Sequence, residues 1–149
     1  MKGEHVLYKS DSDEWGTPQE FFDSLDNEFH FTLDPCATED NHKCKKYFTK
    51  EQNGLKQNWG GHNVFCNPPY SEISEWVKKS YKEGQTDHTV VVLLIPARTD
   101  TKYFHDFIYH RAEIRFVKGR LKFNNYNNSN NSNSAPFPSM LVIYRGAYA

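Results

Sequence analysis

The residues with the most distinctive chemistry form the tetrapeptide Asn67-Pro68-Pro69-Tyr70, which follows the apolar run Val64-Phe65-Cys66. The apolar run predicts a buried strand. The two prolines supply no backbone N–H, so they end the strand. Asn67 is held extended because it precedes a proline. The pattern therefore predicts a rigid loop at the carboxyl end of a strand, the edge of an α/β sheet where ligands bind.

This loop has the acceptors to hold a planar amine. The Asn67 side-chain oxygen and the Pro68 carbonyl can each accept one of the two amine hydrogens, which draws the nitrogen toward tetrahedral geometry and makes its lone pair available for attack. Tyr70 offers an aromatic face on which a base can stack. The tetrapeptide resembles the signature of amino-methyltransferases, with Pro69 as its fourth candidate catalytic residue. A tight strand-to-helix turn with a packed tyrosine is the alternative.

The composition indicates one globular domain. The chain has 149 residues, of which 37% are hydrophobic and 15% aromatic, with a net charge of −1. This length suffices for one core, and a nucleic-acid partner would need local basic patches. Three cysteines without a signal peptide fit a reducing cytoplasm. The longest apolar runs are too short to cross a membrane.

The N-terminal part predicts a polar lead-in over residues 1–14 and then a capped helix. Thr17 and Glu20 form a capping box, and Pro18 takes the first helical position. The helix runs to about Glu28. The local pattern favours simply a well-capped helix; the alternative is that Trp15 and the helix N-terminus form part of a cofactor pocket.

A second candidate site follows the predicted strand 31–34, which ends in Asp34-Pro35-Cys36-Ala37. A carboxylate at the carboxyl end of a first strand is well placed for a cationic or hydroxyl group of a ligand. An ordinary Asp-Pro turn is the alternative. Cys36, His42 and Cys44 do not have the spacing of common zinc sites, so we predict no metal. The basic segment 43–50 is either a phosphate-contacting loop or a solvated face.

The second half predicts further alternation of helices and strands. Helices are expected over 73–83 and after residue 101, with a strongly apolar strand at 89–95 between them. Three short strands follow, at 113–117, 121–123 and 140–144. The Asn/Ser-rich segment 124–134 is expected to be a mobile loop. Candidates for phosphate contacts in this half are Arg98, Lys102, Arg111, Arg115, Lys118, Arg120 and Lys122. Scattered, solvated charge is the alternative for at least half of them.

This order of elements predicts an α/β fold with a mostly parallel sheet, helices on both faces and an antiparallel closing strand at the edge. From Trp15 to Tyr144 the chain resembles the phage DNA N-6-adenine methyltransferase family. The resemblance is carried by seven blocks, WGTP (15–18), LDPCA (33–37), NGL (53–55), FCNPPY (65–70), LIPARTDT (94–101), GRLKF (119–123) and APFPSM (135–140).

The resemblance implies a single-domain, Rossmann-like class I methyltransferase over residues 15–149. It implies that S-adenosylmethionine is the methyl donor, that adenine in DNA is the acceptor, and that the protein is phage or prophage encoded and works in the bacterial cytoplasm. The target adenine would be flipped out of the helix or single-stranded. The implied cofactor-binding residues are Trp15, Thr17, Pro18, Asp34, Cys36, Ala37 and Asn53.

Asn53 departs from the family pattern, because many relatives have Asp-Gly-Leu where this chain has Asn53-Gly54-Leu55. Two other functions stay open at this point. The same loop would serve an RNA amine or the side-chain amide of a protein glutamine. A non-catalytic nucleic-acid-binding relative would keep the fold without cofactor affinity.

Overall fold

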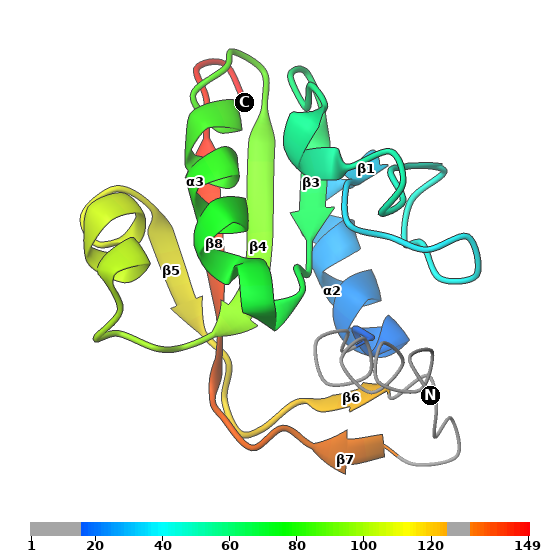
Figure 1. Cartoon of the computed structure of the whole chain (residues 1–149), viewed down its shortest axis with the longest axis vertical. Helices are drawn as coiled ribbons and strands as arrows, with labels where there is room; N and C mark the ends of the chain where they lie inside the picture. Colours follow the sequence, from blue (N-terminus) through cyan, green and yellow to red (C-terminus); the bar gives the residue numbers. More distant parts are fainter. Residues whose placement is uncertain (1–15, 125–131) are drawn as a thin grey trace.

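The computed structural model describes residues 16–124 and 132–149. The predicted lead-in 1–14, Trp15 and residues 125–131 lie outside the described residues. The main sheet has six strands in the order β2-β1-β3-β4-β8-β5 (Figure 1). Their bounds are β1 Leu33–Asp34, β2 Lys46–Tyr47, β3 Asn63–Cys66, β4 Val90–Pro96, β5 Glu113–Phe116 and β8 Ser139–Arg145.

The sheet is parallel from β2 to β4, and β8 is antiparallel to both of its neighbours, β4 and β5. This confirms the mixed α/β class. The expected antiparallel closing strand is confirmed as β8, which lies inside the sheet, and β5 pairs antiparallel with it at one edge. The reason for this order is burial: residues 139–144 of β8 are all buried and need neighbours on both sides, whereas Glu113 and Arg115 let β5 face solvent.

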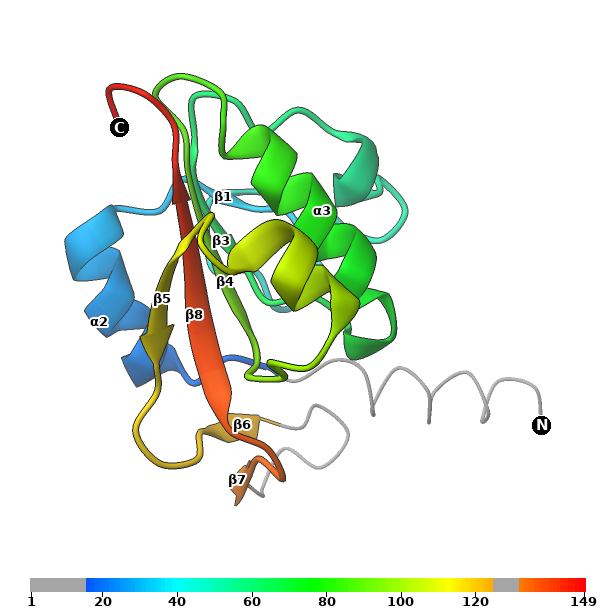
Figure 2. The same cartoon turned by 90° about the vertical axis from the view of Figure 1, so that its left-hand side faces the viewer.

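Helices cover both faces of the sheet. Figure 2 shows α2 (Gln19–Phe29) on one side and α3 (Ile73–Glu83) with the short helix η3 (Phe104–Ile108) on the other. On the α2 side, Phe22 contacts Phe65 of β3 edge to face, with ring centroids 5.1 Å apart. On the α3 side, Trp76 and Val77 pack in a second core cluster. The sheet therefore has an apolar core on each face, as expected for strands buried on both sides.

The start of α2 differs from the predicted capping box. The helix begins at Gln19, Pro18 is its N-cap residue, and no side chain caps it. Thr17 is buried, and its hydroxyl accepts a hydrogen bond from another part of the chain instead. The prediction failed because a capping pattern is local, whereas the partner of Thr17 is fifty positions away in the sequence.

Strand β6 (Lys122–Asn124) lies at the strand predicted for 121–123, whereas β7 (Ser132–Ser134) and β2 were not predicted. Strands β6 and β7 form a separate antiparallel ladder. The predicted loop 124–134 is therefore paired at both ends. The strand β2 was missed because its two residues carry no apolar alternation. Among the described helices, none is long and apolar enough for a membrane span.

Candidate active site

The predicted catalytic loop leaves β3 at Cys66 and turns into α3 through the short helix η2 (Tyr70–Glu72). Pro69 is extended, and its carbonyl accepts the Glu72 N–H at 3.1 Å, which closes the turn. No backbone N–H among the described residues donates to the Pro68 carbonyl. Of the two proline carbonyls, that of Pro68 therefore has the capacity to accept a hydrogen from a bound amine.

Thr17 orients the side chain of Asn67. The Asn67 Nδ2 donates to the Thr17 Oγ1 at 2.8 Å, and Thr17 is only 3% exposed. Because this contact engages the nitrogen end of the amide, the oxygen end is turned away from Thr17. The hydrogen bond thus selects the amide orientation that presents an acceptor, which is the group that a bound amine requires.

Asp34 is a buried carboxylate held by the loop that follows it. Its Oδ2 accepts the Lys43 backbone N–H at 2.9 Å and its Oδ1 accepts that of Cys36 at 3.3 Å. Burial raises the pKa of Asp34 to about 6, while these two N–H groups act in the opposite direction. The carboxylate is ionised at neutral pH, and its burial makes it a strong attractor for a cationic ligand group.

The segment 53–55 lies against the segment 33–37 because residue 54 is glycine. A Cβ at Gly54 would lie 2.0 Å from the Pro35 carbonyl oxygen. The Gly54 carbonyl accepts the Trp59 Nε1–H at 2.9 Å. Asn53 has a φ of 57°, a left-handed conformation that Asn tolerates well, and its side chain accepts the Leu55 N–H. Asn53 therefore shapes this turn as well as lining the site.

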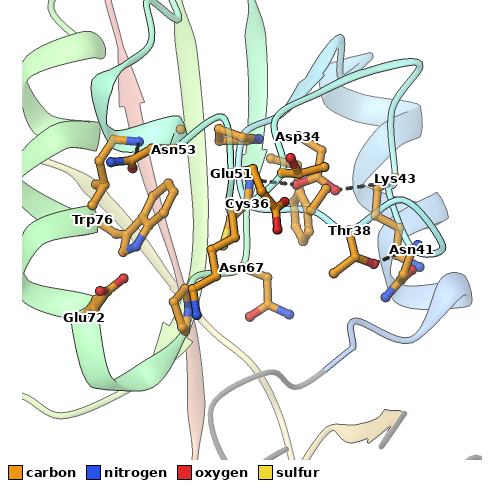
Figure 3. Close-up of a pocket in the computed structure, with 18 of the residues that line it drawn as sticks. Asp34, Cys36, Thr38, Asn41, Lys43, Glu51, Asn53, Asn67, Glu72 and Trp76 are labelled. Atoms are coloured by element: carbon orange, nitrogen blue, oxygen red, sulfur yellow. Dashed lines mark hydrogen bonds between the residues drawn. The ribbon is translucent and has the colours of Figure 1, made fainter. Parts of the chain in front are cut away.

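These segments enclose a cavity of about 780 Å³ at the carboxyl ends of β1 and β3. Figure 3 shows Asp34, Cys36, Asn53, Asn67 and Trp76 arranged around it. Among the described residues, the lining includes five carboxylates and two lysines. The acidic members are Asp34, Glu39, Glu51, Glu72 and Glu75. A net negative lining favours a ligand that carries positive charge.

The structure brings most of the predicted site residues into this one cavity. Those that line it are Thr17, Asp34, Cys36, Ala37, Asn53, Asn67 and Pro69. Pro18 and Pro68 are not in its lining, although each is adjacent to a residue that is. Tyr70 lines a neighbouring cavity instead, and Ser71 belongs to both linings. Trp15 lies outside the described residues.

The cavity wall also contains residues that were not predicted as part of the site, among them Lys43, Phe65 and Trp76. Lys43 supplies the N–H that holds Asp34, and burial lowers the pKa of its ammonium group. Trp76 and Phe65 line the cavity although their spacing indicates only core packing. The Trp76 Nε1 is buried and has no hydrogen-bond partner among the described residues. The one signal in the sequence for the place of Trp76 in the cavity wall is that it follows the predicted catalytic loop closely.

The cysteines do not gather into a metal-binding cluster. Within residues 16–124 and 132–149, no three His, Cys, Asp or Glu side chains are placed to hold a metal ion. Cys66 is fully buried, and burial raises the pKa of its thiol. Cys44 is also buried, and its thiol pKa is raised to about 12. Both thiols stay protonated and pack as small apolar groups.

Comparisons with known proteins point to a single family. The profile of the DNA N-6-adenine-methyltransferase (Dam) family matches residues 4–148. The chain is 33% identical over 139 residues to the DNA N-6-adenine-methyltransferase of Haemophilus phage HP1, covering 91% of this chain and 80% of that protein. It is 34% identical over 111 residues to the DNA N-6-adenine-methyltransferase of Escherichia phage T1, covering 73% of this chain but only 46% of that protein.

Proposed function

Because this chain belongs to the DNA N-6-adenine-methyltransferase (Dam) family, we propose that it transfers a methyl group from S-adenosylmethionine to the N6 amine of adenine in DNA. The observation that carries this proposal is the Asn67-Pro68 acceptor pair beside an acidic cavity that contains the buried carboxylate of Asp34. The phage relatives support a phage or prophage origin and a reaction in the bacterial cytoplasm.

The charge of the cavity supports S-adenosylmethionine as its ligand. The ligand carries a sulfonium and an ammonium group, and the lining has more carboxylates than lysines. We assign Asp34 to the ammonium group or a ribose hydroxyl, and Trp76 and Phe65 to apolar contacts. Thr17, Pro18, Cys36, Ala37 and Asn53 complete the proposed cofactor site, together with Trp15. When bound, S-adenosylmethionine would supply a methyl group on an activated sulfonium.

The chain itself contributes positioning. Asn67 accepts one hydrogen of the adenine amine, and the Pro68 carbonyl accepts the other. The closed turn at Pro69 supports the loop that carries these two acceptors. Tyr70 offers its ring to the target base, which is flipped out or single-stranded. Because the nucleophile is the amine lone pair, the proposed mechanism relies on orientation and exclusion of water and uses no metal ion.

The test is methyl transfer by the purified protein. We would incubate it with radiolabelled S-adenosylmethionine and DNA from a host that lacks adenine methylation, digest the DNA and look for labelled N6-methyladenine. Asn67→Ala is expected to lower the rate roughly hundredfold, because one of the two acceptors is lost. The matched control is Asn58→Ala, an exposed asparagine in a distant turn, which should keep the wild-type rate.

The other outcomes separate the rival functions. Label that resists DNase but is released by RNase or protease would assign the acceptor to RNA or protein and overturn the DNA proposal. Folded protein that binds DNA in a salt-dependent manner, but gives no calorimetric heat with the cofactor, would indicate a non-catalytic relative. Full activity of Asn67→Ala would disprove the proposed role of the loop.

A further inference from the structure

The seven basic residues of the second half differ in what they contact. Arg115 forms ion pairs with Glu28 at 2.7 Å and Glu113 at 2.6 Å. Lys102 pairs with Asp106 at 2.7 Å. These two side chains are already neutralised by carboxylates, so they have less positive charge to offer to a phosphate.

The other five basic residues fall into three groups. Arg111 lies over the Tyr81 ring, and Arg120 donates to the Ala135 carbonyl at 3.3 Å. Lys118 and Lys122 are exposed and line neither cavity. Arg98 is the only one of the seven that lines a cavity together with a residue of the catalytic loop. This position makes Arg98 the strongest candidate for contact with the substrate.

Arg98 lies just beyond the carboxyl end of β4. Its guanidinium carbon is 6.0 Å from the centroid of the Phe137 ring, and Tyr70 contacts the same ring with centroids 5.2 Å apart. No carboxylate of the described residues lies within ion-pair distance of Arg98. The Thr101 hydroxyl donates to the Arg98 carbonyl at 2.9 Å, which holds the loop that carries it.

The cavity that Arg98 lines differs in chemistry from the acidic one. It has a volume of about 320 Å³, and its walls contain the hydroxyl-bearing residues Tyr70, Ser71, Ser74, Thr101 and Tyr103. No carboxylate appears among its described lining residues. The Tyr103 hydroxyl is buried; burial raises its pKa, and the neighbouring Thr101 side chain acts in the opposite direction. A guanidinium with several hydroxyl groups is a donor set suited to a phosphate.

We propose that Arg98, together with the hydroxyl groups of this second cavity, binds the phosphodiester next to the target adenosine. Phosphate contacts set the register of a nucleic-acid strand without reading its sequence. A phosphate held at Arg98 therefore places the adjoining base against Tyr70 and directs its amine toward Asn67. This inference rests on the proposed function, and it assigns Arg98 as a positioning residue, not a catalytic one.

The first test compares Arg98→Gln with Arg111→Gln, which removes the same charge outside both cavities. For Arg98→Gln we expect the KM for DNA to rise about ten- to hundredfold. We also expect the slope of log K against log salt to become shallower by about one for duplex DNA. Cofactor affinity, measured by calorimetry, should stay within about twofold and reports that the variant is folded. Arg111→Gln should match the wild type.

The second test replaces single phosphates. Once the methylated adenine has been mapped, oligonucleotides with one neutral methylphosphonate at each position around it are assayed. At one position the substitution should weaken wild-type binding but have no further effect on Arg98→Gln. Arg98→Lys, which keeps the charge but loses the planar fork, should recover part of the affinity.

Two results would overturn the proposal. One is an unchanged KM and salt slope in Arg98→Gln. The other is additivity of the variant and every methylphosphonate, which would place the phosphate contact elsewhere. Both results can be distinguished from a failure of the proposed function, because methylation of DNA by the wild type is measured first. If the wild type does not methylate DNA, the proposed function fails, and Arg98 then has no substrate phosphate to position.

Discussion

Thr17 has a role that neither its residue type nor its place before α2 predicts. Its hydroxyl is buried and accepts the Asn67 amide N–H. The side chain of Asn67 would otherwise have two amide orientations, of which only one presents an acceptor. At the residue scale, the site therefore depends on pairs: Thr17 orients Asn67, and the Lys43 N–H orients Asp34.

Thr17→Val tests the first pair. Valine has the same shape but no hydroxyl, so the amide orientation of Asn67 is no longer selected. We expect kcat to fall about five- to tenfold, as for the loss of one hydrogen bond, and this fall should exceed any rise in the Kd for the cofactor, whose proposed site Thr17 also lines. Thr17→Ser should recover most of the rate. A raised Kd with unchanged kcat would instead mean that Thr17 contacts only the cofactor.

The raised pKa of Asp34 predicts that the affinity for the cofactor depends on pH. Its pKa is raised from 3.8 to about 6, so the carboxylate is largely protonated at about pH 5 and ionised at about pH 8. The ionised form attracts a cationic ligand, so affinity for S-adenosylmethionine should rise about tenfold or more over this interval. Calorimetry at both pH values on the wild type and on Asp34→Asn measures this change in affinity. A variant that keeps the wild-type pH dependence would exclude Asp34 as the cause.

The raised pKa of Asp34 also affects the stability of the unliganded protein, but there the effect of increasing pH is unfavourable. Because the folded-state pKa is raised, Asp34 contributes about 3 kcal/mol that is present below pH 3.8 and is lost as the pH rises through about 6. Ionising this carboxylate without a cationic partner is unfavourable for folding. Ligand binding and folding therefore respond to the titration of Asp34 in opposite directions.

At the scale of elements, the cavity forms where three connecting segments meet beyond the ends of β1 and β3. Each segment is short and has one backbone feature that shapes it. Pro69 closes the turn after β3, the N–H groups after β1 bind Asp34, and Gly54 allows the third segment to approach Pro35. The parallel pairing of β1 with β3 brings these segments to the same edge of the sheet.

Gly54→Ala tests the contact between two of these segments. The added Cβ would lie 2.0 Å from the Pro35 carbonyl oxygen, so the backbone has to move. We expect the free energy of unfolding to fall by about 1–3 kcal/mol, and cofactor affinity to fall as well because Asn53 moves. The control is Gly61→Asn, where φ is 80° and no atom lies within 4 Å. Chemical denaturation should show it unchanged within about 0.5 kcal/mol.

At the scale of the whole molecule, the charge is divided between the two cavities. The net charge is only −1, yet one cavity has mainly carboxylates and the other has a guanidinium without a carboxylate in its described lining. In the proposed function, a cationic cofactor and an anionic strand would be attracted to these two neighbouring cavities, and the proposed catalytic loop lies between them. Local charge, not net charge, determines what each site binds.

Cofactor binding should be linked to global stability, because the cavity is built from segments across the first half of the chain. At a concentration of one hundred times its Kd, S-adenosylhomocysteine should add about 2.7 kcal/mol to the free energy of unfolding. For a domain of this size, that corresponds to roughly 5–10 °C in Tm. Thermal unfolding with and without the ligand measures the shift, and an unchanged Tm would contradict the assigned cavity.

Local patterns in the sequence determined a large part of this protein. The apolar runs at 64–66, 89–95 and 140–144 predicted three strands of the core, and the spacing of Ile73, Trp76 and Val77 predicted α3. The seven blocks indicated the family, which the comparisons confirm. These predictions succeeded because strand and helix periods and the backbone limits of proline are local properties.

The tertiary structure alone decided which residues become partners. Thr17 and Asn67 are fifty positions apart, and Gly54 contacts Pro35 only because the two segments fold over the same sheet edge. Seven basic residues were equivalent in the sequence until ion pairs with Glu28, Glu113 and Asp106 separated two of them from Arg98. The physical reason is that hydrogen bonds and ion pairs depend on distances across the folded chain, which sheet order and register determine and local composition does not.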